Sequence, residues 1–200
     1  MAGGHPRDAL GRVLPHSWWP LDRQAAGELE FLRRFCNSTN HENGAERFDS
    51  PASLDRWLVE EGARPVAARR SELEELIDVR HTLLRLVMAN STGDDDPDAW
   101  RTLHAAVSSV QFGVELSVER GGHRLELAPR GGGVEMLLGR LLLAVLDAQR
   151  SGTWPRLKSC LHCRWVVFDP SKNRSSRWCS MSACGGRHNA RRYRARKSPV

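Results

Sequence analysis

Four cysteines near the C-terminus form the pattern that most directly indicates chemistry in this chain. Cys160, Cys163, Cys179 and Cys184 are spaced C-x2-C-x15-C-x4-C. Two close thiolate pairs, separated by a segment long enough for a hairpin, can bind one tetrahedral zinc ion with Zn–S bonds of about 2.3 Å. A structural disulfide or a redox pair is the alternative. We expect zinc, because the first twenty residues lack the apolar stretch of a secretion signal and a cytoplasmic location keeps thiols reduced.

A metal held by four thiolates has no free position for water or substrate. We therefore expect a structural zinc ion and a protein that is not an enzyme. A metal-dependent nuclease built around His188 is a weaker alternative. A catalytic metal needs carboxylate ligands, and Asp169 is the only acidic side chain after residue 150.

Basic side chains crowd the segment that contains the cysteines. Residues 151–200 hold 12 Lys/Arg and one acid, a net charge of +11, whereas residues 1–150 carry −5. This separation predicts a polyanion-binding module on an acidic body. The candidate DNA-binding residues are Lys172, Arg174, Arg177, Arg187, Arg191, Arg192, Arg194, Arg196 and Lys197. RNA binding, docking of the basic helix on the acidic body, and an adaptor that binds an acidic protein partner remain open alternatives.

The elements that must position the cysteines can be read from the same segment. Cys160 and Cys163 form a tight knuckle, and Arg164–Phe168 has the apolar content of a strand. Asp169 and the residues after it are typical of a turn, so Arg177–Cys179 is predicted to return as the second strand of a hairpin. Ser180 and Ser182 are plausible N-caps of a basic helix. Knuckle, hairpin and helix in this order predict a treble-clef-like zinc finger.

The preceding part of the chain has the apolar spacing of a mainly helical domain. Helices are predicted over residues 21–36, from Pro51 to Gly62, over 71–91 behind an S-x-x-E capping box at Ser71, from Pro97 onward, and over 134–150. Alternating apolar residues on both sides of Gly121-Gly122 predict one β-hairpin. The expected fold class is therefore α+β. The expected domains are a flexible extension over 1–20, a mainly helical domain over 21–152 and a zinc finger over 153–200.

A polar loop in the helical domain is the candidate site for a small effector. Asn37, Ser38, His41 and Glu42 lie between two predicted helices and would line such a pocket, although a plain surface loop is the simpler interpretation. The apolar helix over 134–150 could serve either the core or a homodimer. The sequence contains no run of 18 apolar residues, so we expect no membrane-spanning helix.

Two stretches resemble known families. Leu157–Lys197, with CRWVVFDPSKNRSSRWCSMSACGGR followed by HNARRYRARK, resembles the CGNR zinc finger, except that Gly186 stands where that family has its asparagine. The part before it is similar to the ABATE domain, in Phe35-Cys36-Asn37-Ser38 and in the helix that begins at Asp49-Ser50-Pro51. The resemblance implies a stress-linked bacterial transcription regulator with a structural zinc ion.

Overall fold

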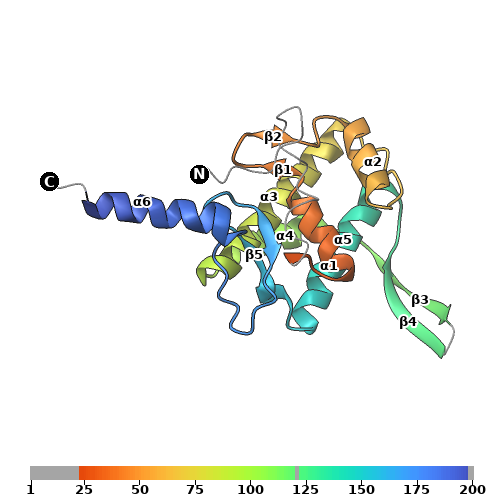
Figure 1. Ribbon diagram of the computed structural model, residues 1–200. Coiled ribbons are helices and arrows are strands. Elements are labelled where there is room, and N and C mark those ends of the chain that lie inside the picture. Colours follow the sequence, from red (N-terminus) through yellow and green to blue (C-terminus); the bar gives the residue numbers. More distant parts are fainter. Residues whose placement is uncertain (1–22, 120–121, 198–200) are drawn as a thin grey trace.

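The computed structural model describes residues 23–119 and 122–197 and shows a mainly helical body that leads into a small C-terminal module (Figure 1). The helices are α1 (Gly27–Cys36), α2 (Pro51–Glu60), α3 (Arg70–Thr92), α4 (Pro97–Val107), α5 (Gly133–Arg150) and α6 (Gly186–Lys197), with short turns η3 (Trp154–Arg156) and η4 (Met181–Gly185). The strands β1 (Thr39–Asn40), β2 (Ala45–Glu46), β3 (Phe112–Glu119), β4 (Gly122–Pro129), β5 (Leu157–Ser159) and β6 (Val166–Phe168) form three antiparallel pairs. The predicted α+β class is confirmed. The proposed extension over 1–20 lies outside the described residues.

Side-chain caps set the starts of two helices where the sequence predicts them. The Ser50 hydroxyl accepts a hydrogen bond from the Ser53 N–H before α2, and Asp96 accepts one from the Ala99 N–H before α4. In both helices a proline occupies the first turn, where its missing N–H costs nothing. These short-range contacts are readable from sequence because donor and acceptor are three residues apart.

Two helix starts differ from the prediction. Helix α1 begins at Gly27 rather than at residue 21, and the Glu30 carboxylate accepts a hydrogen bond from the backbone N–H of Ala25, which holds the chain just before the helix in a non-helical conformation. The box before α3 is formed by Glu72, which accepts from the backbone N–H of Arg69 at 2.7 Å, and not by Ser71 and Glu74. Glu74 is instead paired with Arg70.

The core of the body is formed mainly by α3 and α5, against which the other helices pack. An aromatic cluster of Phe31, Phe35, Phe48 and Trp57 fills the side under α1 and α2, with ring centroids 5.3–6.0 Å apart. The same core contains Leu157 of β5 and Val166 of β6, both with 0% exposure. The first strands of the C-terminal module are thus part of the body's own core.

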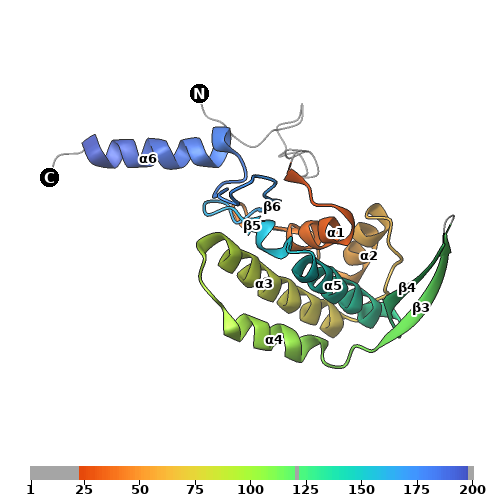
Figure 2. The same cartoon turned by 90° about the horizontal axis from the view of Figure 1, so that it is seen from below.

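The predicted hairpin is confirmed as β3–β4, and it projects away from the helices (Figure 2). Its base is held close to α5, because a Cβ on Gly139 would lie 2.3 Å from the Pro129 side chain. Only glycine permits this approach of strand to helix. Beyond the base, the hairpin extends into solvent.

The strand pairing of the C-terminal module differs from the prediction. Strand β6 pairs with β5, which precedes the knuckle, in the register Leu157↔Phe168 to Ser159↔Val166. Residues Arg177–Cys179 form no strand. The reason is tertiary, because β5 is already anchored on α3. The Asn90 amide donates hydrogen bonds to the Trp154 and Leu157 carbonyls, and the Ser91 hydroxyl accepts one from the Ser159 N–H.

Helix α6 leaves the module and extends away from the body, at the opposite end of the molecule from the β3–β4 hairpin (Figures 1 and 2). None of its residues is buried. Among the described residues, no helix is both long and apolar enough to cross a membrane.

Candidate zinc site and nucleic-acid interface

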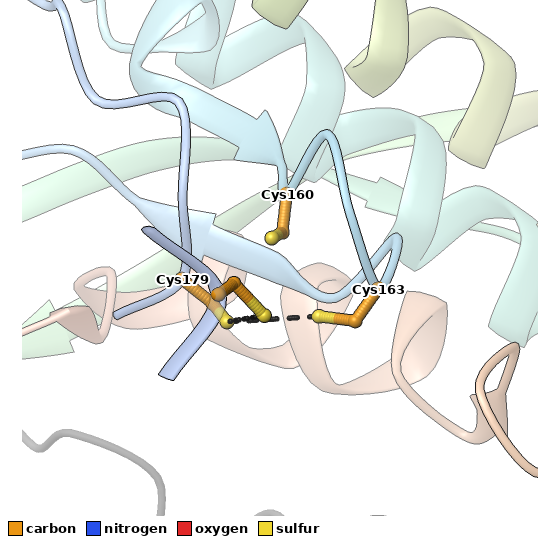
Figure 3. Close-up of side chains that lie close together, drawn as sticks. Cys160, Cys163 and Cys179 are labelled. Atoms are coloured by element: carbon orange, nitrogen blue, oxygen red, sulfur yellow. Dashed lines mark hydrogen bonds between the residues drawn. The ribbon is translucent and has the colours of Figure 1, made fainter. Parts of the chain in front are cut away.

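The four cysteines of the C-terminal module converge in the folded chain. Cys160 directly follows β5, Cys163 lies in the turn before β6, Cys179 precedes η4, and Cys184 lies within it. All four sulfur atoms lie within 4.8 Å of one another and all four residues are buried. The Cys179 sulfur is 3.6 Å from that of Cys163 and 3.5 Å from that of Cys184 (Figure 3).

These separations fit one zinc ion. Four sulfurs at about 2.3 Å from a tetrahedral zinc ion lie about 3.8 Å from one another. The two sulfur–sulfur distances from Cys179 are slightly shorter than this and far longer than a disulfide bond of about 2.05 Å. Hydrogen bonds with Cys160 raise the pKa of Cys163 and of Cys179, because crowded thiols resist ionising together. A divalent cation at the centre of the four sulfurs removes that obstacle.

The knuckle that presents the first two cysteines is built by backbone hydrogen bonds. Cys160 donates to the Trp165 carbonyl at 2.8 Å, and Arg164 donates to the Cys160 carbonyl at 2.9 Å. Arg164 has a φ of +65°, a left-handed conformation that turns the chain back toward β6. Trp165 and Val167 then pack on the cysteines.

The second pair of cysteines is held by a capped turn. The Ser180 hydroxyl accepts from the Ala183 N–H, as the sequence predicts, and starts the π-helical turn η4 that contains Cys184. Trp178 packs on the cysteine cluster and also against His188, with ring centroids 4.7 Å apart. The metal site therefore fixes the start of α6.

Comparison with known families agrees with this architecture. Residues 156–197 match the CGNR zinc finger, and residues 30–152, more than half of the chain, match the ABATE domain, whose description is "putative stress-induced transcription regulator". The chain belongs to the ABATE family and carries a CGNR zinc finger. No curated protein matches the chain. The predicted cofactor, one structural zinc ion, is confirmed by the cysteine cluster within the CGNR finger.

The CGNR finger departs from the family's motif at Gly186, which replaces the asparagine and is not one of the four cysteine ligands. Gly186 opens α6 with ordinary helical angles, φ −61° and ψ −42°. A Cβ there would meet the Met181 carbonyl oxygen at 3.5 Å, an ordinary contact, so nothing in this structure requires glycine. Gly185 is different, because a Cβ would lie 2.9 Å from the Met181 sulfur.

Cys36, the fifth cysteine of the ABATE chain, has no part in the metal site. It lies in the core at the end of α1 with 1% exposure. Burial raises the pKa of its thiol to about 12. It is therefore an apolar core residue and provides a control for any experiment on the four clustered cysteines.

The basic residues predicted to bind DNA lie on two exposed elements of the CGNR finger. Lys172, Arg174 and Arg177 belong to the loop between β6 and Cys179 and are exposed. The other six lie on α6, and all but the half-buried Arg187 are exposed: Arg187, Arg191, Arg192, Arg194, Arg196 and Lys197. No acidic side chain belongs to α6.

The single acid of residues 151–200 does not offset this charge at the surface. Asp169 has 0% exposure, and its carboxylate accepts hydrogen bonds from the backbone N–H groups of Ser171 and Ser176 at 3.0 and 2.8 Å. Burial alone would raise the pKa of Asp169, but these hydrogen bonds hold it below its ordinary value. Its role is to fold the loop that carries Lys172 and Arg174.

The four residues predicted to bind an effector are not brought together. The Asn37 amide clamps the Val166 backbone with two hydrogen bonds of 2.8 Å, so it joins α1 to β6. The Ser38 hydroxyl accepts from the fully buried Arg80, and Glu42 forms an ion pair with Arg187 at 2.6 Å. Of the four residues, His41 lines a cleft.

That cleft lies between the ABATE body and the CGNR finger and has a volume of about 670 Å³. His41, His81 and Arg85 contribute from the body together with the acidic run of residues 94–96, whose Asp96 is paired with Arg85, and His162 and Arg164 contribute from the knuckle. Sequence reasoning missed His81 and Arg164, which are more than 80 residues apart from each other. No local pattern could have placed them in one wall.

Proposed function

We propose that this chain is a transcription regulator that binds DNA through its CGNR finger. The observation that supports the proposal most strongly is α6, which has six cations, no acid and no buried residue, and which extends from the molecule on a metal-fixed base. Cations spaced along an exposed helix are suited to the phosphate backbone, which dominates the affinity of proteins for DNA.

Each part of the CGNR finger has a defined task in this proposal. The zinc ion, held by the four cysteines, is structural and orients α6. The side chains of α6 contact phosphates, and the exposed loop with Lys172, Arg174 and Arg177 adds charge next to the helix. Arg187 is held by Glu42 of the body, whose hydrogen bond raises the pKa of the guanidinium. It therefore fixes the root of the helix on the ABATE body.

A salt series tests the proposal. Fluorescence anisotropy with random-sequence duplex DNA is expected to show binding whose log K falls with log salt at a slope of about −4 to −5, because four to six phosphates are neutralised. Chelation of zinc is expected to abolish binding. An affinity independent of salt, or no binding by the zinc-loaded protein at low salt, would refute DNA binding and favour the adaptor alternative.

The nuclease alternative gains no support from the site. His188 packs on Trp178, and the Asp169 carboxylate is buried in its own loop. Within residues 23–119 and 122–197, the cysteine cluster is the only group of at least three His, Cys, Asp or Glu residues arranged to hold a metal ion. A nuclease would need a second such group.

We further propose that the cleft between body and finger binds a small effector, whose anionic group lies at the wall of His41, His81 and Arg164 and away from the aspartates of residues 94–96. Burial first, and then the nearby Arg80, His81 and Arg164, lower the pKa of His41, which reflects a positive potential at that wall. A ligand there would contact the body and the zinc knuckle at once, and so could change the orientation of the finger.

The effector site is tested by thermal denaturation in inorganic phosphate against equal ionic strength of chloride. Phosphate is expected to raise the melting temperature saturably in the parent protein. The shift is expected to disappear in Arg164→Asn, because asparagine tolerates the left-handed backbone but removes the charge. Equal shifts in both proteins, with full zinc content, would contradict this site.

A further inference from the structure

The β3–β4 hairpin exposes an apolar face that the fold of one chain leaves uncovered. Val114 and Leu116 are each 60% exposed, Val118 is 72% exposed, and on the neighbouring strand Leu125 and Leu127 are 71% and 45% exposed. Val114 is directly opposite Leu127, and Leu116 is directly opposite Leu125. Residues opposite each other across a pair share a face, so these five side chains form one continuous surface, the apolar face of the hairpin.

The apolar face is not an effect of irregular structure, because the alternation is strict. The intervening pairs, Glu115↔Glu126 and Ser117↔Arg124, put polar side chains on the opposite side of the hairpin. A two-stranded hairpin in water is only marginally stable by itself. Aliphatic residues selectively on one side of such a hairpin indicate that another surface covers that side.

The apolar face continues onto the helical body at the base of the hairpin. A groove of about 710 Å³ lies between β4 and α5, where Leu125 and Leu127 are joined by Met136 and Leu143 of α5. Met136 is itself 41% exposed. Hairpin and groove together thus offer a long apolar strip that ends in a shallow hollow.

The charges around this strip favour a second copy of the same chain as its occupant. The groove is rimmed by three acidic and three basic side chains, and ion pairs within the chain, Glu28–Arg140 and Glu126–Arg124, already join four of them; the remaining two are Asp147 and Arg150. A rim that carries both signs equally can complement itself about a two-fold axis. It gives no uniform field for nucleic acid or for a strongly acidic or basic protein.

We propose that this chain forms a two-fold homodimer in which the apolar faces of two β3–β4 hairpins pack together, with the tip of each hairpin over the groove of its partner. An eight-residue strand is about 27 Å long, enough for a hairpin to span its partner's face and reach the groove. Each copy contributes one apolar face and one groove. Because the contact rests mainly on one two-stranded hairpin, a weak dimer with a dissociation constant on the order of micromolar is expected.

Dimerisation through the hairpin does not depend on DNA binding. The hairpin and α6 lie at opposite ends of the molecule, so dimerisation leaves the basic helix uncovered. A monomeric variant should keep its zinc content and its affinity per DNA site. Loss of dimer and loss of DNA binding are consequently separate outcomes.

Sedimentation velocity of the full zinc-loaded chain, over about 1–100 μM, tests the proposal. The parent protein is expected to shift from monomer to dimer over this range. Leu116→Thr with Leu125→Thr, a cross-strand pair in which β-branched threonine retains strand propensity, is expected to weaken dimerisation at least tenfold. The matched control, Glu115→Thr with Ser117→Thr, changes the opposite side of β3 at residues that do not line the groove, and it is expected to dimerise as the parent does.

Three results would overturn the proposal. One is a parent protein that stays monomeric at every concentration. Another is a Leu116→Thr, Leu125→Thr variant that dimerises as strongly as the control variant. The third is open-ended oligomers, which would indicate edge-to-edge pairing of exposed strands instead of a closed two-fold contact. A substitution in the hairpin could also unfold the protein. A monomeric variant therefore supports the homodimer only if its zinc content and melting temperature equal those of the parent protein.

Discussion

Replacement of Cys179 by serine is expected to release the zinc ion and to unfold the segment that carries α6. The Cys179 sulfur has neighbouring sulfurs on both sides, at 3.6 and 3.5 Å, so its loss opens the site at its centre. Zinc binding contributes on the order of 10 kcal/mol in small structural sites, which no other contact of α6 replaces, since none of its residues is buried. The expected results are a zinc content near zero, loss of amide protection in residues 179–197, and loss of DNA binding.

Cys36→Ala is the matched control for that experiment. It also removes a buried thiol, but from the core of the ABATE body, where the residue touches no metal. The control is expected to lower the melting temperature moderately while zinc content and DNA affinity stay at parental values. A Cys179→Ser protein that keeps one equivalent of zinc and a protected α6 would show that the four cysteines do not act as one site.

Replacement of Arg191 and Arg194 by alanine is expected to reduce DNA affinity and to flatten its salt dependence. Both residues are exposed on α6. If each neutralises one phosphate, the slope of log K against log salt becomes less negative by about 1.8. At salt near 0.1 M the affinity is expected to fall by about 10- to 100-fold. Zinc content should remain full, because neither residue supports the cysteine cluster.

The control for the Arg191→Ala, Arg194→Ala variant removes two positive charges from the ABATE body instead of from α6. Arg56 and Arg64 are exposed residues of the ABATE body, and their replacement by alanine leaves α6 intact. The slope of the control is expected to equal that of the parent protein. An equal loss of slope in both variants would mean that net charge alone drives binding, and the assignment of α6 as the interface would be wrong.

The sequence by itself determined the parts of this protein whose chemistry is local. A zinc knuckle needs two thiols at close spacing, and Cys160 and Cys163 show it without any tertiary information. The caps at Ser50, Asp96 and Ser180 connect atoms three residues apart. The alternation of β3 and β4 identified which side chains share a face, and the sequence showed that positive charge is concentrated in residues 151–200.

Tertiary structure decided how these parts are connected, because the deciding contacts join residues far apart in the chain. Strand β6 pairs with β5 and not with Arg177–Cys179, since Leu157 and Val166 gain burial in the body's core. Asn37 became a clamp on Val166, 129 residues away. Alternation could show that the hairpin has an apolar face, but only the fold shows that this face projects beyond the helices that would otherwise cover it.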